Sequence, residues 1–194
     1  MNAAIIIFDD FTDIDLFLIW DILGRQSLGW EVKILGQKNE HVSTNGLSIK
    51  THGNIAESIN FDVVIFCSGK KGTRKVINDQ SFLNSIRLDI NKQLIGSICS
   101  GALIMAKLGL LDGLTATTHP QAKKELQSLG IEAVDKPLVA HKNIATTGGC
   151  LAGVYLAAWL IQNKHGTAKR DEVIEELLPV GQQAIYQELI AKSI

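Results

Sequence analysis

Cys99 is the residue of this sequence whose position most clearly suggests chemistry. It lies in "QLIGSICSGALIMAKLGLLDG" (93–113), where an apolar run of strand length is followed by apolar residues at helical spacing. Four small residues flank it and permit a sharp turn: Gly96, Ser97, Ser100 and Gly101. Such a strand-to-helix turn resembles a nucleophile elbow, and a helix N-terminus stabilises a thiolate. The pattern favours a nucleophilic thiol over the alternative, a small buried apolar residue.

An acidic cluster follows the first apolar run, and Asp15 is its most informative member. Asp15 lies between Ile14 and the pair Leu16-Phe17, on the part of a predicted helix that should face inward. A carboxyl group in apolar surroundings beside a thiol would have a raised pKa, so it could hold or transfer a proton. The alternative is that Asp15 only caps a helix within a solvated acidic loop.

Two further segments could contribute to the same site. Gly69, in "FCSGKKG", follows a strand that ends at Phe66, and its N–H could pair with that of Ser100 to stabilise a developing negative charge. A simple turn glycine would give the same pattern. His119, in "TTHP", could reach the same edge, although a capping or surface histidine is the alternative.

The remaining cysteines and a basic run receive simpler interpretations. Cys67 is at a strand end without an elbow, and Cys150 opens an apolar helix, so we assign Cys150 to the core. No C-x-x-C spacing is present, and no metal site is predicted. The basic run is interpreted as a solvated helix face, or as a group that attracts an anionic substrate: Lys70, Lys71, Arg74 and Lys75.

The composition restricts the classes of partner and the compartment. The formal net charge of −1 favours neither nucleic acid nor an anionic membrane as a partner. The longest uncharged apolar run, residues 151–161, is too short to cross a bilayer. Three separated cysteines, and a start "MNAAIIIFDDF" without a basic leader, predict a reduced, cytoplasmic protein.

Strands alternate with helices along the 194 residues, so we expect an α/β three-layer sandwich with a mostly parallel sheet, as one domain over 1–194. Ligands of such sheets bind beyond the carboxyl ends of the strands. The strands are expected at 3–8, 30–35, 46–52, 61–66, 93–98 and 115–119, with a hairpin at 137–147. Helices are expected at 12–25, 73–91, 99–109, 120–129 and 149–162, followed by a helical tail.

These residues together resemble the ThiJ/PfpI family of the class I glutamine amidotransferase-like superfamily. The similar segments are "FDVVIFCSGKKG", "IGSICSGALIMAKLGLLDG", "ATTHP" and "IATTGGCLAGVYLAAWLI", in the family's order and spacing. The resemblance implies a flavodoxin-like fold, a homodimer and a reactive elbow cysteine at Cys99. It also implies an acidic partner at Asp15, oxyanion amides at Gly69 and Ser100, and a nearby histidine at His119.

Within the family, the sequence is most similar to the isonitrile hydratases and to the sensor domains of related regulators. That branch carries Asp in a context close to "FTDIDLF" and a hydroxyl residue after the cysteine, here Ser100 rather than Thr. Departures at the expected pocket are "FLIW" (17–20) and Cys67-Ser68.

We therefore expect a cofactor-independent cysteine enzyme that acts on a small molecule, most like an isonitrile hydratase. One alternative is a non-catalytic sensor of a metabolite or of oxidation. The other is a glyoxalase or deglycase acting on 2-oxoaldehydes.

Overall fold

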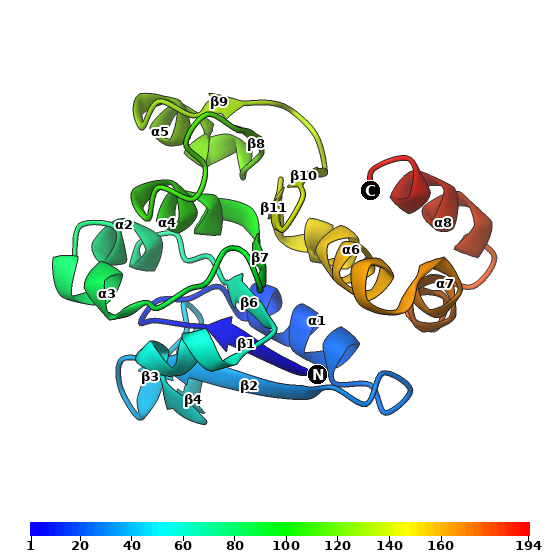
Figure 1. Ribbon diagram of the computed structural model, residues 1–194, viewed down its shortest axis with the longest axis horizontal. Helices are drawn as coiled ribbons and strands as arrows, with labels where there is room; N and C mark the ends of the chain where they lie inside the picture. Colours follow the sequence, from blue (N-terminus) through cyan, green and yellow to red (C-terminus); the bar gives the residue numbers. More distant parts are fainter.

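The computed structural model describes residues 1–194, and its centre is a seven-stranded sheet (Figure 1). The strands are β1 (Asn2–Ile6), β2 (Glu31–Gly36), β5 (Gly53–Asn54), β6 (Val63–Phe66), β7 (Leu94–Ser97), β10 (Leu138–His141) and β11 (Ile144–Thr147). Their order in the sheet is β10-β11-β7-β6-β1-β2-β5, and every neighbouring pair is parallel except β10 with β11. The expected mostly parallel sheet is confirmed.

The chain has eight α-helices. They are α1 (Asp13–Leu23), α2 (Gly72–Val76), α3 (Gln80–Ser85), α4 (Ala102–Lys107), α5 (Lys123–Ser128), α6 (Gly153–His165), α7 (Thr167–Glu175) and α8 (Gln183–Ala191). Figure 1 shows α1 and α6 on one side of the strands and α2, α3 and α4 on the other. Helices α1 and α6 pack against each other, and α4 packs against β6. This gives the expected three layers, with α7 and α8 as the predicted helical tail.

The smaller elements lie outside the main sheet. Strands β3 (Glu40–Val42) and β4 (Ser48–Lys50) form a hairpin, and β8 (Thr115–Ala116) pairs with β9 (Glu132–Ala133). Short 3₁₀ helices cover Ile55–Asn60, Cys99–Gly101, Pro120–Ala122 and Cys150–Ala152. No helix combines the length and the apolar character that crossing a bilayer requires.

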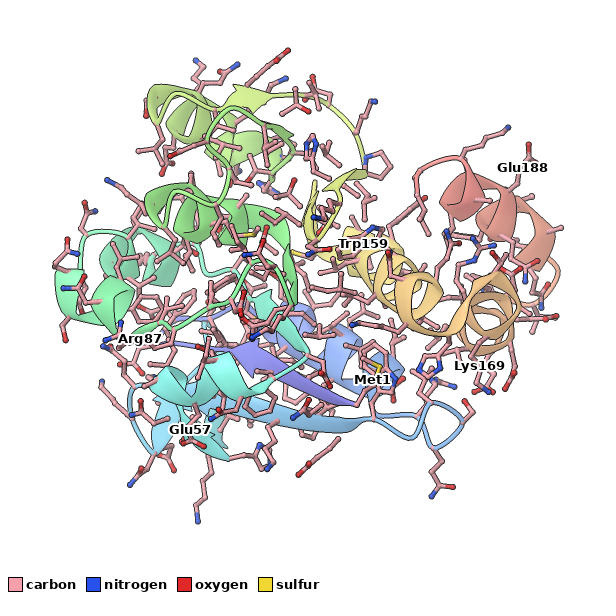
Figure 2. The ribbon with its side chains drawn as sticks, viewed as in Figure 1. Met1, Glu57, Arg87, Trp159, Lys169 and Glu188 are labelled. Atoms are coloured by element: carbon pink, nitrogen blue, oxygen red, sulfur yellow. The ribbon has the colours of Figure 1, made fainter.

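The core follows directly from the apolar runs. Residues 3–8 and 63–67 are at most 2% exposed, because strands in the middle of a parallel sheet are covered on both faces. They belong to a continuous cluster of 51 buried apolar residues. In Figure 2, Trp159 of α6 lies in the interior and is 4% exposed, whereas Glu57 and Glu188 lie at the periphery.

The expected helix over 73–91 is wrong in its continuity. The structure has two short helices there, α2 and α3, and residues 86–91 leave the helical conformation. The break comes at Asp79, whose backbone is extended and whose carboxylate accepts hydrogen bonds from the N–H groups of Ser81 and Phe82. Asp79 is therefore an N-cap that starts a new helix, which helical periodicity alone does not reveal.

Candidate active site

Cys99 lies on a strained turn between β7 and α4. Its φ is 56°, in the left-handed region that costs a non-glycine residue about 1–2 kcal/mol. The chain passes from the extended Ile98 into the 3₁₀ helix Cys99–Gly101 and then into α4. A Cβ on Gly101 would lie 2.6 Å from the carbonyl oxygen of Phe66, so only glycine lets the start of this helix approach the end of β6. These features form the sharp turn expected of a nucleophile elbow.

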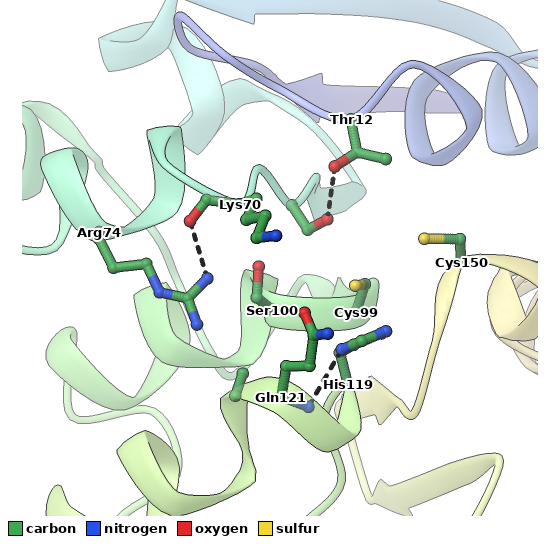
Figure 3. A pocket seen from close by; sticks show the side chains of 10 residues that line it. Thr12, Lys70, Arg74, Cys99, Ser100, His119, Gln121 and Cys150 are labelled. Carbon is green, nitrogen blue, oxygen red and sulfur yellow. Dashed lines mark hydrogen bonds between the residues drawn. The ribbon is translucent and has the colours of Figure 1, made fainter. Parts of the chain in front are cut away.

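The thiol of Cys99 faces a cavity of about 180 Å³ (Figure 3). The residue is 7% exposed and lines this cavity. The lining comes from loops at the carboxyl ends of β1, β6 and β7 and from the segments around His119 and Cys150. The lining residues are Thr12, Ser68, Lys70, Arg74, Cys99, Ser100, His119, Gln121, Ala122 and Cys150.

Asp15 lies in the first turn of α1 and is completely buried. One carboxyl oxygen, Oδ2, accepts a hydrogen bond of 3.2 Å from the Ser68 N–H, and the other, Oδ1, is buried without a partner. Burial raises the pKa of Asp15, although contact with Ser68 and Cys150 opposes the shift. A raised pKa favours a protonated carboxyl group, which can act as a proton donor beside the thiol.

The side chains of Asp15, Cys99 and Cys150 lie close together. One carboxyl oxygen and the two sulfur atoms all lie within 4.8 Å of one another. Cys150 opens the 3₁₀ helix that precedes α6 and is half-buried, and its thiol faces the cavity. The assignment of Cys150 to the core is therefore wrong: the turn before α6 directs this side chain toward Cys99 (Figure 3).

Cys150 also affects the acidity of Cys99. Its thiol can donate a hydrogen bond to the Cys99 thiolate, and this interaction, together with contacts to the Ser68 hydroxyl and the Ser100 N–H, lowers the pKa of Cys99. Burial and the nearby Asp15 oppose that shift. The pKa of Cys150 itself is raised, because loss of its proton would break the interaction with Cys99. Cys99 is therefore the thiol of this pair that ionises first.

Gly69 and Ser100 are joined through a third residue, Thr73. The Gly69 N–H donates a 2.8 Å hydrogen bond to Thr73 Oγ1, which lies 3.1 Å from Ser100 Oγ. Gly69 is not part of the cavity lining, and a Cβ there would lie 2.2 Å from the carbonyl oxygen of Asp10. Its amide is therefore engaged within the protein, whereas the Ser100 side chain lines the cavity and its N–H is near the sulfur.

His119 lines the same cavity as the elbow residues Cys99 and Ser100. Its Nδ1 accepts a 3.2 Å hydrogen bond from the Gln121 N–H and so caps the 3₁₀ helix Pro120–Ala122. With Nδ1 as the acceptor, a neutral ring carries its proton on Nε2. The neighbouring Thr118 hydroxyl donates a 2.8 Å hydrogen bond to the Cys99 carbonyl oxygen, which fixes this segment against the elbow.

The basic run divides between the cavity and its surroundings. Lys70 and Arg74 line the cavity, and Arg74 forms an ion pair with Glu125, with Nε 2.9 Å from Oε2. Lys75 instead pairs with Asp10 on the surface, at 2.6 Å. A positive charge at the cavity is therefore provided by Lys70, while the charge of Arg74 is balanced within the protein.

Three residues at the site were not singled out from the sequence: Thr12, Thr73 and Gln121. Ser68 was noted only as a departure from the family pattern, and Cys150 was assigned to the core. Ser68 and Thr73 had an available signal, because they follow β6 at the carboxyl edge of the sheet, where ligands of such folds bind. Cys150 had no sequence signal for a site role, because an apolar helix follows it directly.

The chain matches the DJ-1/PfpI family over residues 1–163. It is 31% identical to an isonitrile hydratase from Pseudomonas putida over 125 residues, which cover 64% of this chain and 54% of that enzyme. It is 24% identical to the deglycase PH1704 from Pyrococcus horikoshii over 147 residues, 74% of this chain and 87% of that protein.

The fold is shared with solved structures. DJ-1 from Schizosaccharomyces pombe superposes with a TM-score of 0.78 at 18% identity, over 92% of this chain and all of that one. The flavodoxin-like fold expected from the sequence is thereby confirmed. The chain belongs to the DJ-1/PfpI family.

Proposed function

We propose that this protein is a cysteine enzyme that hydrates a small isonitrile to an N-substituted formamide, with Cys99 as nucleophile and Asp15 as acid and base. The observation that carries the proposal is the buried Asp15 carboxyl group, with one unpartnered oxygen, close to a thiol of lowered pKa at a cavity. The identity with an isonitrile hydratase supports this choice of substrate class.

In the first half of the reaction, the Cys99 thiolate attacks the terminal carbon of the isonitrile. A carbon–sulfur bond forms, and the electron pair left on that carbon takes the proton of the Asp15 carboxyl group. The product is a thioimidate on Cys99, and Asp15 becomes a carboxylate. The raised pKa of Asp15 supports its protonated starting form.

In the second half, the Asp15 carboxylate accepts a proton from water as the oxygen attacks the thioimidate carbon. Asp15 then returns this proton to the nitrogen. The tetrahedral intermediate collapses when its hydroxyl proton passes to Asp15 and the carbon–sulfur bond breaks. The formamide leaves, and the protonated carboxyl group and the thiolate are restored, so the sum is isonitrile plus water.

The groups around the sulfur stabilise the charge that develops during these steps. The Ser100 N–H and the Ser68 hydroxyl interact with the Cys99 sulfur. The Ser100 hydroxyl lines the cavity, and its contact with Thr73 orients it. Gly69 acts on Thr73 through its N–H. The Nε2–H of His119 is available to a polar group of the substrate. A volume of about 180 Å³ suits an isonitrile with a small substituent.

The test is a comparison of purified variants in an isonitrile hydration assay, with formamide formation followed by NMR. Cys99→Ala should abolish turnover and leave the fold intact, and Asp15→Asn should reduce turnover by about 100-fold or more, the size of a general acid–base contribution. Cys67→Ala is the matched control, because that cysteine is fully buried outside the cavity. Hydration by Cys99→Ala at the parent rate would refute the mechanism.

Two other functions have specific support. Glyoxalase or deglycase activity is supported by His119 at the cavity and by the similarity to the Pyrococcus deglycase, and it predicts lactate from methylglyoxal. A sensor of oxidation is supported by the lowered pKa of Cys99, and it predicts addition of two oxygen atoms under mild peroxide without turnover of either substrate. Intact-mass measurement beside the two activity assays separates all three functions.

We also propose that the protein acts as a homodimer in the cytoplasm. Its three cysteines are free thiols, as in a reducing compartment. Three large apolar side chains are exposed: Ile14 by 42%, Phe17 by 41% and Leu151 by 73%. They lie on α1 and on the Cys150–Ala152 segment, which are in contact, and we propose that they form the dimer interface. Light scattering should give twice the chain mass, and Leu151→Glu should give the single mass. A monomeric parent protein would contradict the dimer.

A further inference from the structure

Three potential metal ligands converge beside the cavity. They are a carboxyl oxygen of Asp15 and the sulfur atoms of Cys99 and Cys150, all within 4.8 Å of one another. They come from α1, from the elbow after β7 and from the 3₁₀ helix before α6. Figure 3 shows the two thiol groups directed toward the same end of the cavity. No spacing in the sequence brings these residues together, so only the fold creates the cluster.

The separations suit a single tetrahedral ion. Zinc binds cysteine sulfur at about 2.3 Å and carboxylate oxygen at about 2.0–2.2 Å, so two sulfur atoms on one tetrahedral ion lie about 3.8 Å apart. The two sulfur atoms and the Asp15 oxygen are at most 4.8 Å apart in the structure. To bind one zinc ion, they therefore need to approach one another by about 1 Å or less. Cys150 is the half-buried member of the three, so its side chain is the least constrained by packing.

A second observation points to a missing ligand at the same place. Asp15 is completely buried, and its Oδ1 atom has no hydrogen-bond partner. Such an atom carries a desolvation cost unless it meets a proton donor or a cation. A cation held by the Asp15 carboxyl group and the two sulfur atoms would balance the buried charge. Both cysteines line the cavity, so a fourth position on the ion is open to water.

We propose that Asp15, Cys99 and Cys150 form a binding site for one thiophilic divalent cation of the zinc class. Two thiolates and one carboxylate select zinc or cadmium, whereas magnesium and calcium require oxygen ligands. The bound ion occupies the electron pair of Cys99 that would attack a substrate. The site therefore inhibits any chemistry of Cys99, and the ion and the substrate exclude each other.

The site is tested by titrating the reduced full-length protein with Co²⁺, which takes the place of zinc and reports its ligands. One equivalent should produce a thiolate-to-cobalt charge-transfer band and the d–d bands of a tetrahedral site, and Zn²⁺ should displace it. Loss of a residue that only hydrogen-bonds to a metal ligand typically weakens metal binding by roughly 10–100-fold. Cys150→Ala and Asp15→Asn each remove a ligand itself, so each should weaken Zn²⁺ binding by more than that. The Cys150 variant should lose about half of the charge-transfer intensity.

Cys67→Ala is the matched control, because it removes a thiol that does not line the cavity, and it should bind like the parent. A parent protein without the charge-transfer band, or a Cys150→Ala variant with the full band and parent affinity, would overturn the site. Thermal unfolding of each variant shows whether lost binding reflects lost structure. Cobalt binding requires no turnover, so failure of the metal site is distinguishable from failure of the isonitrile mechanism.

Discussion

The left-handed backbone at Cys99 predicts that glycine at this position gives a more stable protein than alanine, the reverse of the usual order. An L-residue at a φ of 56° costs about 1–2 kcal/mol, whereas glycine adopts this conformation without that cost. Glycine loses more chain entropy on folding, by about 0.5–1 kcal/mol relative to alanine. Because Cys99→Gly and Cys99→Ala both remove the sulfur, their difference isolates the backbone. The midpoints of these two ranges leave the glycine variant with the larger free energy of unfolding, by about 0.75 kcal/mol.

The assay is thermal and urea unfolding of both variants, followed by circular dichroism. In a chain of this size, 1 kcal/mol corresponds to about 2–4 °C, so the glycine variant should melt about 1–4 °C above the alanine variant. Ala102 provides the control, since its φ of −56° is ordinary helix and Ala102→Gly should lower stability. An alanine variant at 99 as stable as the glycine variant, or more so, would refute the strained elbow.

Two other perturbations test the polar groups behind the thiol. Burial raises the folded pKa of Asp15, so the free energy of unfolding should fall as pH rises from about 3.9 toward that pKa and stay reduced above it. Asp15→Asn should remove this decline and be at least as stable as the parent at neutral pH in urea unfolding; a less stable variant with the decline intact would contradict the raised pKa. Thr73→Val leaves the Gly69 N–H without its acceptor and should cost about 1–3 kcal/mol in the same assay, whereas Thr73→Ser should retain most of that stability.

The sequence predicted those parts of the fold that depend on local patterns. Residues 3–8 and 61–66 are continuous apolar runs, and they lie in β1 and β6 at the centre of the sheet. The hairpin at 137–147 is confirmed as β10 and β11. The break between α2 and α3 was missed, because it depends on the hydrogen bonds of one carboxylate, at Asp79, rather than on periodicity. The two-residue strand β5 was missed because it has no pattern of its own.

In the site too, features set by neighbouring residues were predictable from the sequence, whereas contacts between distant residues were not. Cys99 and its small neighbours are adjacent in the sequence, so their turn was predictable, and the structure places Cys99 there with a positive φ. Asp15 was expected to face inward, and it is fully buried. Cys150 is 51 positions beyond Cys99, and only the packing of α6 against α1 brings it to the thiol. The engagement of the Gly69 amide by Thr73 likewise depends on a side-chain contact that the sequence does not encode locally.

The acidity of the Cys99 thiol is the most direct measure of the central claim. The rate of its alkylation by iodoacetamide, followed across pH by mass spectrometry of the peptide that contains Cys99, gives the thiol pKa. The contacts with Cys150, Ser68 and Ser100 predict a midpoint below the ordinary cysteine value of about 8.5. A midpoint at or above that value would contradict the claim that this turn holds a thiolate ready for reaction.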